Sequence, residues 1–202
     1  AEKKHQQLMA EVNNLKSQIA PHFLFNTLNN LYGLAVDKSE KLPDLMLRLS
    51  NLLRHSLYEA EKPLVPVAEE IGVLKSYSEL ESIRLEDNLK LKFDDTVPKD
   101  SPFQIAPLIL IVFVENAFKH SKLVQGAPVN IYIGTALEND IFTLQVRNNY
   151  NKEKEIETGG IGLTNVRRRL DVLYPEHHLT IEKEDGFYTL TLLLRLSKTS
   201  EE

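Results

Sequence analysis

Residues 106–121, APLILIVFVENAFKHS, combine a long apolar run with a polar end. The run predicts a helix that opens at Pro107 and fills the rest of the stretch, because proline is tolerated in the first helical turn. Within that helix Asn116, Lys119 and His120 are spaced i, i+3 and i+4, so they share one face. The opposite face carries apolar side chains that would pack on a sheet, namely Ile109, Leu110, Phe113 and Ala117.

The polar face of this helix has the chemistry of a magnesium and phosphate site. The amide oxygen of Asn116 can complete the octahedral shell of a magnesium ion without adding charge, and magnesium usually arrives with phosphates and water. Lys119, one turn further on, would supply a positive charge to those phosphates. An ordinary solvated helix face carries the same residue types, so this stretch alone leaves both interpretations open.

A glycine-rich turn, Gly159-Gly160-Ile161-Gly162, leads into a second predicted helix over residues 163–173. Glycine lets backbone N–H groups come close to a phosphate, and the N-terminus of a helix favours an anion. The polar segment before the turn, residues 149–158, could act as a mobile lid. A plain turn at the start of a helix is the alternative, since one glycine cluster is weak support for phosphate binding.

The rest of the C-terminal sequence alternates between helical and strand patterns. The predicted elements are a helix over about 67–86, a strand over 89–93, a hairpin of 129–136 with 141–147, and a hairpin of 179–184 with 188–196. Glu138-Asn139-Asp140 and Asp185-Gly186 are the turn signals of the two hairpins. Helices interleaved with mostly antiparallel hairpins predict an α+β sandwich, with helices on one face of a mixed sheet.

Residues 1–64 are expected to be mainly helical. A first apolar seam is formed by Leu8, Val12, Leu15 and Ile19, and a new line after Pro21 by Leu24, Leu28, Leu31 and Ala35. A second helix is predicted over about 43–61. Two such helices form a hairpin too small to bury its own apolar stripe, so we expect a homodimer in which two hairpins build a four-helix bundle.

His22 lies where the two apolar seams meet, in the sequence Pro21-His22-Phe23-Leu24-Phe25-Asn26. The new line passes through position 21, which places His22 about 100° away from it, toward solvent. A histidine with its reference pKa is mostly neutral at about pH 7.5, so one ring nitrogen offers a lone pair. Asn26, one turn later, could orient the ring. If the polar motifs downstream form a nucleotide site, His22 becomes a candidate phosphate acceptor; otherwise it is an ordinary helix histidine.

Composition excludes several classes of protein. The 202 residues carry a net charge of −5 and no cysteine, which excludes disulfides and thiolate metal sites and suits a reducing compartment. The acidic balance argues against a nucleic-acid partner. No apolar run approaches the roughly 20 residues of a membrane span. The first residues lie inside a helical pattern, so we expect a membrane or sensor segment upstream and a cytoplasmic location for this part.

The order of polar helix, hairpin, polar loop and glycine turn resembles the nucleotide-binding fold that gyrase, histidine kinases and MutL share. The blocks that narrow this resemblance are SQIAPHFLFNTLNNL, LSNLLRHSLYEAEKPLVPVAEEI, YSELESIRLEDNL, APLILIVFVENAFKHS and GGIGLTNVRRRL. They resemble successive blocks of the LytS/YehU-type sensor histidine kinases, from about Leu15 to Leu196. The PHFLFN block is distinctive, whereas the VENAFKH and GGIGL blocks are typical of the wider superfamily.

The resemblance implies a sensor histidine kinase core in two-component signalling. It would transfer a phosphoryl group from ATP, bound with Mg²⁺, onto His22 and then to an aspartate of a response-regulator receiver domain. It also implies a dimerisation and phospho-acceptor region over 1–64 and an ATP-binding domain over 65–198.

The resemblance also implies roles for residues at the ATP site. Asn116 would hold the magnesium ion, with Lys119 and His120 near the phosphates. The other implied residues are Asn148 at the adenine, Gly160, Gly162 and Leu163 at the lid and phosphate turn, Asn165 and Arg169 in the helix that follows, and Arg84 in the connecting helix.

Three departures from the broader histidine kinase pattern bear on activity. Many of these kinases place an acidic residue directly after the histidine, where this chain has Phe23. Asn148 stands where the superfamily often has aspartate, and Asn149-Tyr150 replaces the glycine that often follows. An amide oxygen can accept a hydrogen bond from the adenine amino group but carries no charge, so we expect weaker ATP binding.

Two alternatives remain open. One is a signalling scaffold that binds nucleotide weakly or not at all and acts by dimerisation, which Phe23 and Asn148 would favour. The other is an ATPase of the same superfamily without histidine phosphorylation. Glu115 directly precedes Asn116, whereas hydrolytic relatives usually place their catalytic glutamate one turn earlier, where Val112 stands, and this counts against an ATPase.

Other polar residues are expected at the surface. They are His55 on the flank of the helical bundle, the pair Glu69-Glu70, and the acidic residues of 79–81. The run Arg167-Arg168-Arg169 is expected to be a solvated helix face with one arginine turned inward.

Overall fold

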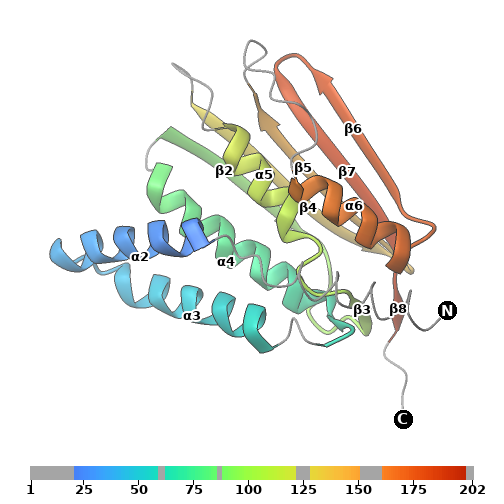
Figure 1. The fold of residues 1–202 in the computed structure, drawn as a ribbon, viewed down its shortest axis with the longest axis horizontal. Helices are drawn as coiled ribbons and strands as arrows, with labels where there is room; N and C mark the ends of the chain where they lie inside the picture. The colour runs from blue at the N-terminus through green and yellow to red at the C-terminus, as the bar shows by residue number, and fades with distance from the viewer. Residues whose placement is uncertain (1–20, 59–61, 86–87, 122–127, 151–160, 199–202) are drawn as a thin grey trace.

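The computed structural model describes residues 21–58, 62–85, 88–121, 128–150 and 161–198 (Figure 1). Its centre is a five-stranded mixed sheet with the strand order β2-β4-β5-β7-β6. The strands are β2 (Leu89–Asp95), β4 (Val129–Glu138), β5 (Ile141–Asn149), β6 (His178–Glu184) and β7 (Phe187–Arg195). β2 runs parallel to β4, and the other neighbouring pairs are antiparallel.

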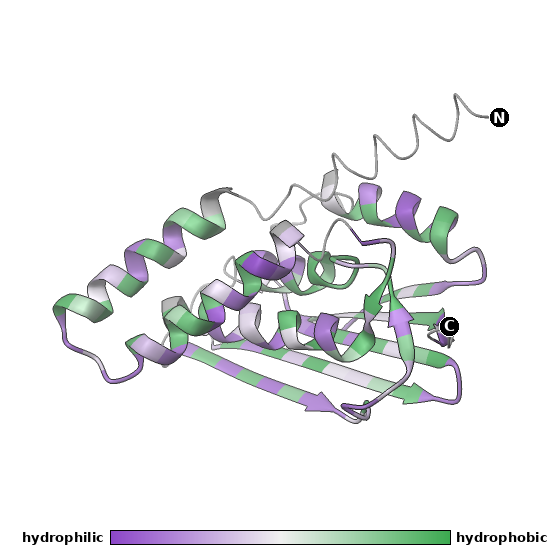
Figure 2. Ribbon diagram, turned by 90° about the horizontal axis from the view of Figure 1, so that it is seen from below, coloured by the Kyte–Doolittle hydropathy of each residue, from purple (hydrophilic) through white to green (hydrophobic). Residues whose placement is uncertain are grey.

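Both predicted hairpins belong to this sheet. Asn139 turns the chain between β4 and β5, and Asp185-Gly186 turns it between β6 and β7, all with positive φ, which these residue types adopt more easily than others. Apolar and polar residues alternate along the strands (Figure 2). Phe142 and Leu144 of β5 are buried, so one face of the sheet is apolar and needs a covering layer.

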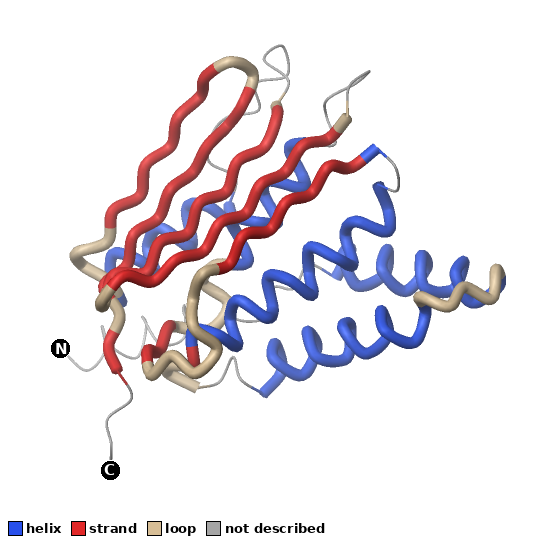
Figure 3. Tube along the Cα trace, turned by 180° about the vertical axis from the view of Figure 1, so that it is seen from behind, coloured by secondary structure: helices blue, strands red, loops and turns tan. Residues whose placement is uncertain are grey.

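Three helices supply that layer, on one face of the sheet (Figure 3). They are α4 (Val67–Leu85), α5 (Ile111–Ser121) and α6 (Ile161–Leu173). α5 contacts β4 and β5 and buries Phe113 and Phe118. A hairpin of α2 (Pro21–Val36) and α3 (Leu42–Tyr58) packs on α4. The predicted α+β fold with a mixed sheet is confirmed.

A second, three-stranded sheet was not predicted. It consists of β1 (Val65–Pro66), β3 (Phe103–Ile105) and β8 (Ser197–Lys198), with β3 in the middle and both pairs antiparallel. Strands of two or three residues are too short to show a period of two, so the sequence carries no signal for them.

Some predicted boundaries were wrong. α5 begins at Ile111 rather than Pro107, because Leu108 has a φ of 56° that no α-helix accommodates. β5 continues through Asn149 instead of ending at Arg147, since its pairing with β7 extends to that residue.

The buried line of α2 also differs from the predicted one. Phe23, Thr27 and Leu31 are buried, whereas Leu28 and Ala35 are exposed. The buried line of α2 therefore begins one position earlier than predicted and shares Leu31 with the predicted line, of which Leu28 and Ala35 face outward. The seam predicted over residues 8–19 lies outside the described residues.

Several residues predicted at the surface are buried. His55, Glu70 and Glu81 are all buried, because α4 packs against both α3 and α5. The single inward arginine is confirmed as Arg169, which is buried. Among the helices of the described residues, none is both long and apolar enough to cross a membrane.

Candidate functional site

α5 presents the polar face that the sequence predicts. The Asn116 side chain is partly exposed, and its Nδ2 donates a hydrogen bond of 2.8 Å to the carbonyl of Val112 on the preceding turn. That bond fixes the amide so that Oδ1 is the group left to accept or to bind a cation. An amide held in this way presents one neutral oxygen, which suits a magnesium ion that takes its other ligands from phosphates and water.

Lys119 and His120 follow at the end of α5. Lys119 is exposed, and His120 is half-buried. Burial, followed by the positive charge of Lys119, lowers the pKa of His120 below its usual value. The histidine is therefore neutral near neutral pH and can both donate and accept a hydrogen bond, while Lys119 supplies the positive charge.

The start of α6 lies against α5. A Cβ built on Gly162 would lie 3.5 Å from Cγ1 of Val112, one turn before Asn116. The first N–H groups of a helix have no partners within it and favour an anion. Leu163 is buried and anchors this end of α6, whereas Asn165 is partly exposed. The fold thus brings the beginning of the glycine-turn helix beside the polar helix, as the nucleotide-site interpretation requires.

Asn148 is the third predicted contributor, and it faces the helix layer. It continues the buried line of β5 and is itself buried. Its Nδ2 donates to the carbonyl of Asn149 at 3.0 Å. The Asn149 side chain is in turn held by the start of β4, because its Oδ1 accepts from the Asn130 N–H at 2.9 Å and its Nδ2 donates to the Pro128 carbonyl at 2.9 Å.

The position of His22, the candidate phospho-acceptor, is given by its neighbour Phe23. His22 is the second residue of α2, and its side chain lies outside the described part, as do Gly160 and the side chain of Arg84. Phe23 is buried, and its ring packs on Tyr77 of α4 with centroids 4.7 Å apart. Tyr77 in turn contacts Phe118 of α5 edge to face, at 5.9 Å. Asn26, one turn after His22, is partly buried.

An acidic pair lies next to Asn116. Burial, followed by the charge of Glu81, raises the pKa of Glu115 to about 7. The Tyr77 hydroxyl donates to Glu81 at 3.4 Å. Val112, one turn before Asn116, is apolar, so the carboxylate of this stretch of α5 is that of Glu115.

Sequence reasoning missed a polar group beneath the site. The Glu70 carboxylate is fully buried and accepts hydrogen bonds from the residues that precede α5. A signal for it exists, because Glu70 stands three residues after Val67 and four before Leu74, on the buried stripe of α4. A glutamate within an apolar stripe indicates a buried partner, and we had assigned it to the surface.

Known proteins similar to this chain indicate its relationship to histidine kinases. A family model described as "Histidine kinase" matches residues 10–89. Sensor protein LytS of Staphylococcus haemolyticus is 31% identical over 179 residues, covering 82% of this chain and 30% of that protein. Sensor protein LytS of Enterococcus faecalis is 30% identical over 178 residues, covering 88% of this chain and 28% of that protein. Together these matches support a LytS-type histidine kinase core. The predicted resemblance to LytS-type sensor histidine kinases is confirmed.

Solved structures show that the kinase core shares its fold with other histidine kinases. The histidine kinase domain of the blue-light activated kinase from Erythrobacter litoralis has a TM-score of 0.53 and 11% identity, covering 96% of this chain and 94% of that one. The catalytic domain of the histidine kinase ThkA has a TM-score of 0.51 and 16% identity, covering 65% and 95%. The chain spans less than a third of the length of the LytS relatives it matches.

Proposed function

We propose that this kinase core binds ATP with Mg²⁺ between α5, the start of α6 and the end of β5, and transfers the γ-phosphoryl group to His22. The observation that carries the proposal is the position of Gly162 against Val112, which places a helix N-terminus beside the fixed amide of Asn116. The similarity to LytS-type histidine kinases supports the same reaction. The division into a phospho-acceptor region over 1–64 and an ATP-binding domain over 65–198 is part of this proposal.

Each site residue has a role that follows from its surroundings. Asn116 Oδ1 would hold the magnesium ion, which would neutralise phosphate charge. Lys119 attracts the phosphates, and neutral His120 donates a hydrogen bond to them. Asn148 contacts the adenine with its oxygen, while its nitrogen stays on the Asn149 carbonyl. Among the described residues, no three His, Asp or Glu side chains gather into a metal site.

The phosphoryl transfer needs little from the protein beyond positioning and charge neutralisation. A ring nitrogen of neutral His22 attacks the γ-phosphorus, the new N–P bond forms as the bond to the bridging oxygen breaks, and ADP leaves. Phe23 contributes by holding this end of α2 on α4 through Tyr77. Asn26 orients the ring, in place of the acidic neighbour that other kinases use.

The helical hairpin carries the features of a dimerisation surface. A groove of about 720 Å³ lies between α2 and α3, lined by Leu28, Leu31, Tyr32, Ala35, Leu42, Met46, Leu49, Ser50, Leu53, Arg54 and Tyr58. Tyr32, Met46 and Tyr58 are large apolar side chains more than half exposed, which monomeric proteins rarely gather in one patch. We propose that a second copy covers this groove.

We also propose the step that follows the labelling of His22. The phosphoryl group passes from His22 to a response-regulator receiver domain, and this takes place on the cytoplasmic side of a membrane-anchored sensor.

Incubation of the chain with labelled ATP and magnesium tests the reaction. We expect acid-labile, base-stable label on the wild type, and none on His22→Gln or Asn116→Ala. Binding of a fluorescent ADP analogue should survive His22→Gln and be lost in Asn116→Ala. Label that persists in His22→Gln would refute the assignment of the acceptor.

A catalytically weak scaffold is the second candidate, favoured by the neutral Asn148 and by Phe23. It predicts a concentration-dependent dimer without label and without nucleotide binding. ATP hydrolysis that survives His22→Gln would instead indicate an ATPase, in which case Glu115, with its pKa near 7, is the first residue to substitute.

A further inference from the structure

The start of α5 is held by a carboxylate from another helix. Glu70 of α4 is fully buried, and it accepts the Leu108 N–H at 3.0 Å on Oε2 and the Leu110 N–H at 3.3 Å on Oε1. The N–H groups at a helix start have no partners within the helix, and the helix dipole favours a negative charge there. Glu70 therefore acts as the N-terminal cap of α5, 40 residues before Leu110 in the chain.

The same carboxylate is bonded to the helical hairpin. Nε2 of His55, on α3, lies 3.2 Å from Glu70 Oε2, and the two side chains are 7% and 0% exposed. An ionised carboxylate accepts, so the His55 Nε2–H donates. A buried carboxylate is costly unless donors surround it, and His55 is the one donor of this set that does not come from the segment before α5.

The segment before α5 is held on its other side by α6. Arg169 donates to the Pro107 carbonyl at 2.9 Å and to the Leu108 carbonyl at 3.4 Å. Burial lowers the pKa of Arg169, and the charge of Glu70 opposes that shift. Residues 107–110 therefore lie between Glu70 of α4 and Arg169 of α6, and both side chains bond to their backbone. Glu70 is in turn bonded to His55 of α3.

We infer that Glu70 is a positioning residue for Asn116, and that His55 makes this positioning depend on where α3 lies. The inference rests on the proposed role of Asn116 at the ATP site. Asn116 follows Leu110 by six residues, so it lies about 9 Å further along the helix, and a slip of one residue would turn it by about 100°. The cap fixes both the rotation and the height of α5, and it thereby fixes the direction of the Asn116 amide.

α3 has a second polar contact on α4, which makes a matched control. Arg48 pairs with Glu79, at the other end of the α3–α4 contact from His55 and Glu70. Arg48 and Glu79 are both partly exposed, and neither is bonded to α5 in the described residues. Both pairs join the same two helices, but only the His55–Glu70 pair continues to the start of α5.

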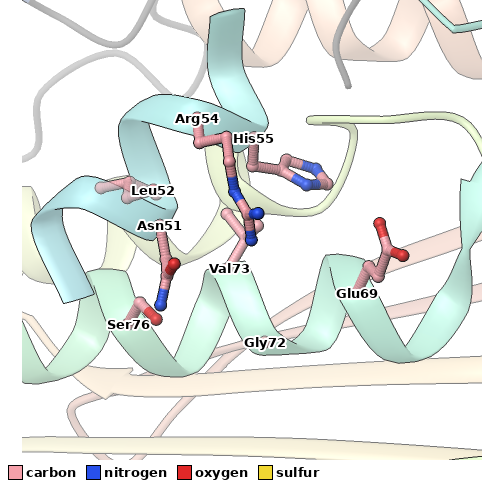
Figure 4. A pocket seen from close by; sticks show the side chains of 8 residues that line it. All are labelled: Asn51, Leu52, Arg54, His55, Glu69, Gly72, Val73 and Ser76. Atoms are coloured by element: carbon pink, nitrogen blue, oxygen red, sulfur yellow. The ribbon is translucent and has the colours of Figure 1, made fainter. Parts of the chain in front are cut away.

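A solvent-open pocket lies beside His55. It has a volume of about 350 Å³ and lies between α3 and α4, with Arg54 and His55 above Gly72 and Ser76 (Figure 4). A Cβ added at Gly72 would meet no atom within 4 Å. Close-packed helices resist displacement, and the contact between α3 and α4 is not close-packed at this place.

Three variants of the full chain test the inference. His55→Phe keeps a ring but loses the donor, His55→Gln keeps an N–H that can reach Glu70, and Arg48→Gln breaks the control pair. We expect His55→Phe to speed amide hydrogen exchange at Leu108 and Leu110 by on the order of 10-fold, since a hydrogen bond to a charged group is lost. Affinity for a fluorescent ADP analogue with Mg²⁺ should fall by about the same factor. His55→Gln and Arg48→Gln should behave as wild type in both measurements.

Three outcomes would overturn the inference. Unchanged exchange in His55→Phe would show that the cap does not depend on α3, and faster exchange with unchanged nucleotide affinity would show that the cap does not position Asn116. An equal loss in Arg48→Gln would indicate general loosening of the hairpin. If His55→Phe fails to fold, as judged by circular dichroism, His55→Leu replaces it. A wild type that binds nucleotide but never labels His22 refutes the proposed kinase reaction alone, because exchange and affinity are read without catalysis.

Discussion

Phe23→Ala should detach the start of α2 from α4. Phe23 is 6% exposed and packs on Tyr77. Removing a buried phenyl ring costs about 3–5 kcal/mol, and we expect the lower end, about 3 kcal/mol, because the site lies where two helices meet and can partly collapse. At about 1.4 kcal/mol for each tenfold change, the ratio of folded to unfolded protein would fall by on the order of 100-fold. Urea unfolding followed by circular dichroism measures the change in the free energy of unfolding.

Phe25→Ala is the matched control for this substitution. Phe25 lies two residues later on the same helix and is 68% exposed, so it has little to lose within one protomer. In a dimer it could still contribute to the partner contact, and that contribution would depend on protein concentration. Unfolding at two concentrations separates the effects, since the Phe23→Ala loss should be the same at both. A loss below about 1 kcal/mol in Phe23→Ala, or equal losses in both variants, would refute the anchoring of α2 through Phe23.

Three further substitutions test the site. The raised pKa of Glu115, about 7 against 4.5 in the unfolded chain, means that the contribution of Glu115 to stability is most favourable below about pH 4.5 and is lost as pH rises through 7. Glu115→Gln should remove this contribution to the pH dependence, up to about 3 kcal/mol. Identical urea midpoints against pH in both proteins would contradict it. Asn148→Asp should lower stability by about 2 kcal/mol above pH 5, because a buried acceptor would then face the Asn149 carbonyl, and a thermal melt that is unchanged or raised would argue otherwise. Gly162→Ala should leave the melting temperature unchanged or slightly raised but weaken nucleotide binding in a titration, whereas unchanged binding would show that Gly162 does not approach phosphate.

The fold was largely predictable because its long elements repeat a clear period. The strands of both hairpins alternate, and the residues between them favour positive φ, so Asp185-Gly186 was recognisable as a turn. The start of α5 was not predictable in the same way. Pro107 suits a first helical turn, but tertiary contacts from Glu70 and Arg169 hold the next residues outside the helix, and such contacts have no local signature.

In the candidate site, too, residues related by local spacing were predictable and residues joined by tertiary contacts were not. Asn116, Lys119 and His120 could be grouped from helical spacing, and the structure places them on one helix with the amide of Asn116 fixed by Val112. The buried pair of His55 and Glu70 could not be found, because the two residues are 15 positions apart and each alone is typical of a surface. Only the position of Glu70 on the apolar stripe of α4 could have indicated it.

The two ends of α2 differ in how firmly they are packed. Phe23 fixes one end of α2, while Tyr32 and Val36 near the other end are exposed, and the turn to α3 projects away from the sheet (Figure 1). α2 has 16 residues, so it is about 24 Å long, and a tilt of about 10° at the Phe23 end would displace the far turn by about 4 Å. Since the chain has no cysteine, a single one introduced at Val36 would carry a spin label or dye to the place where such a tilt is largest.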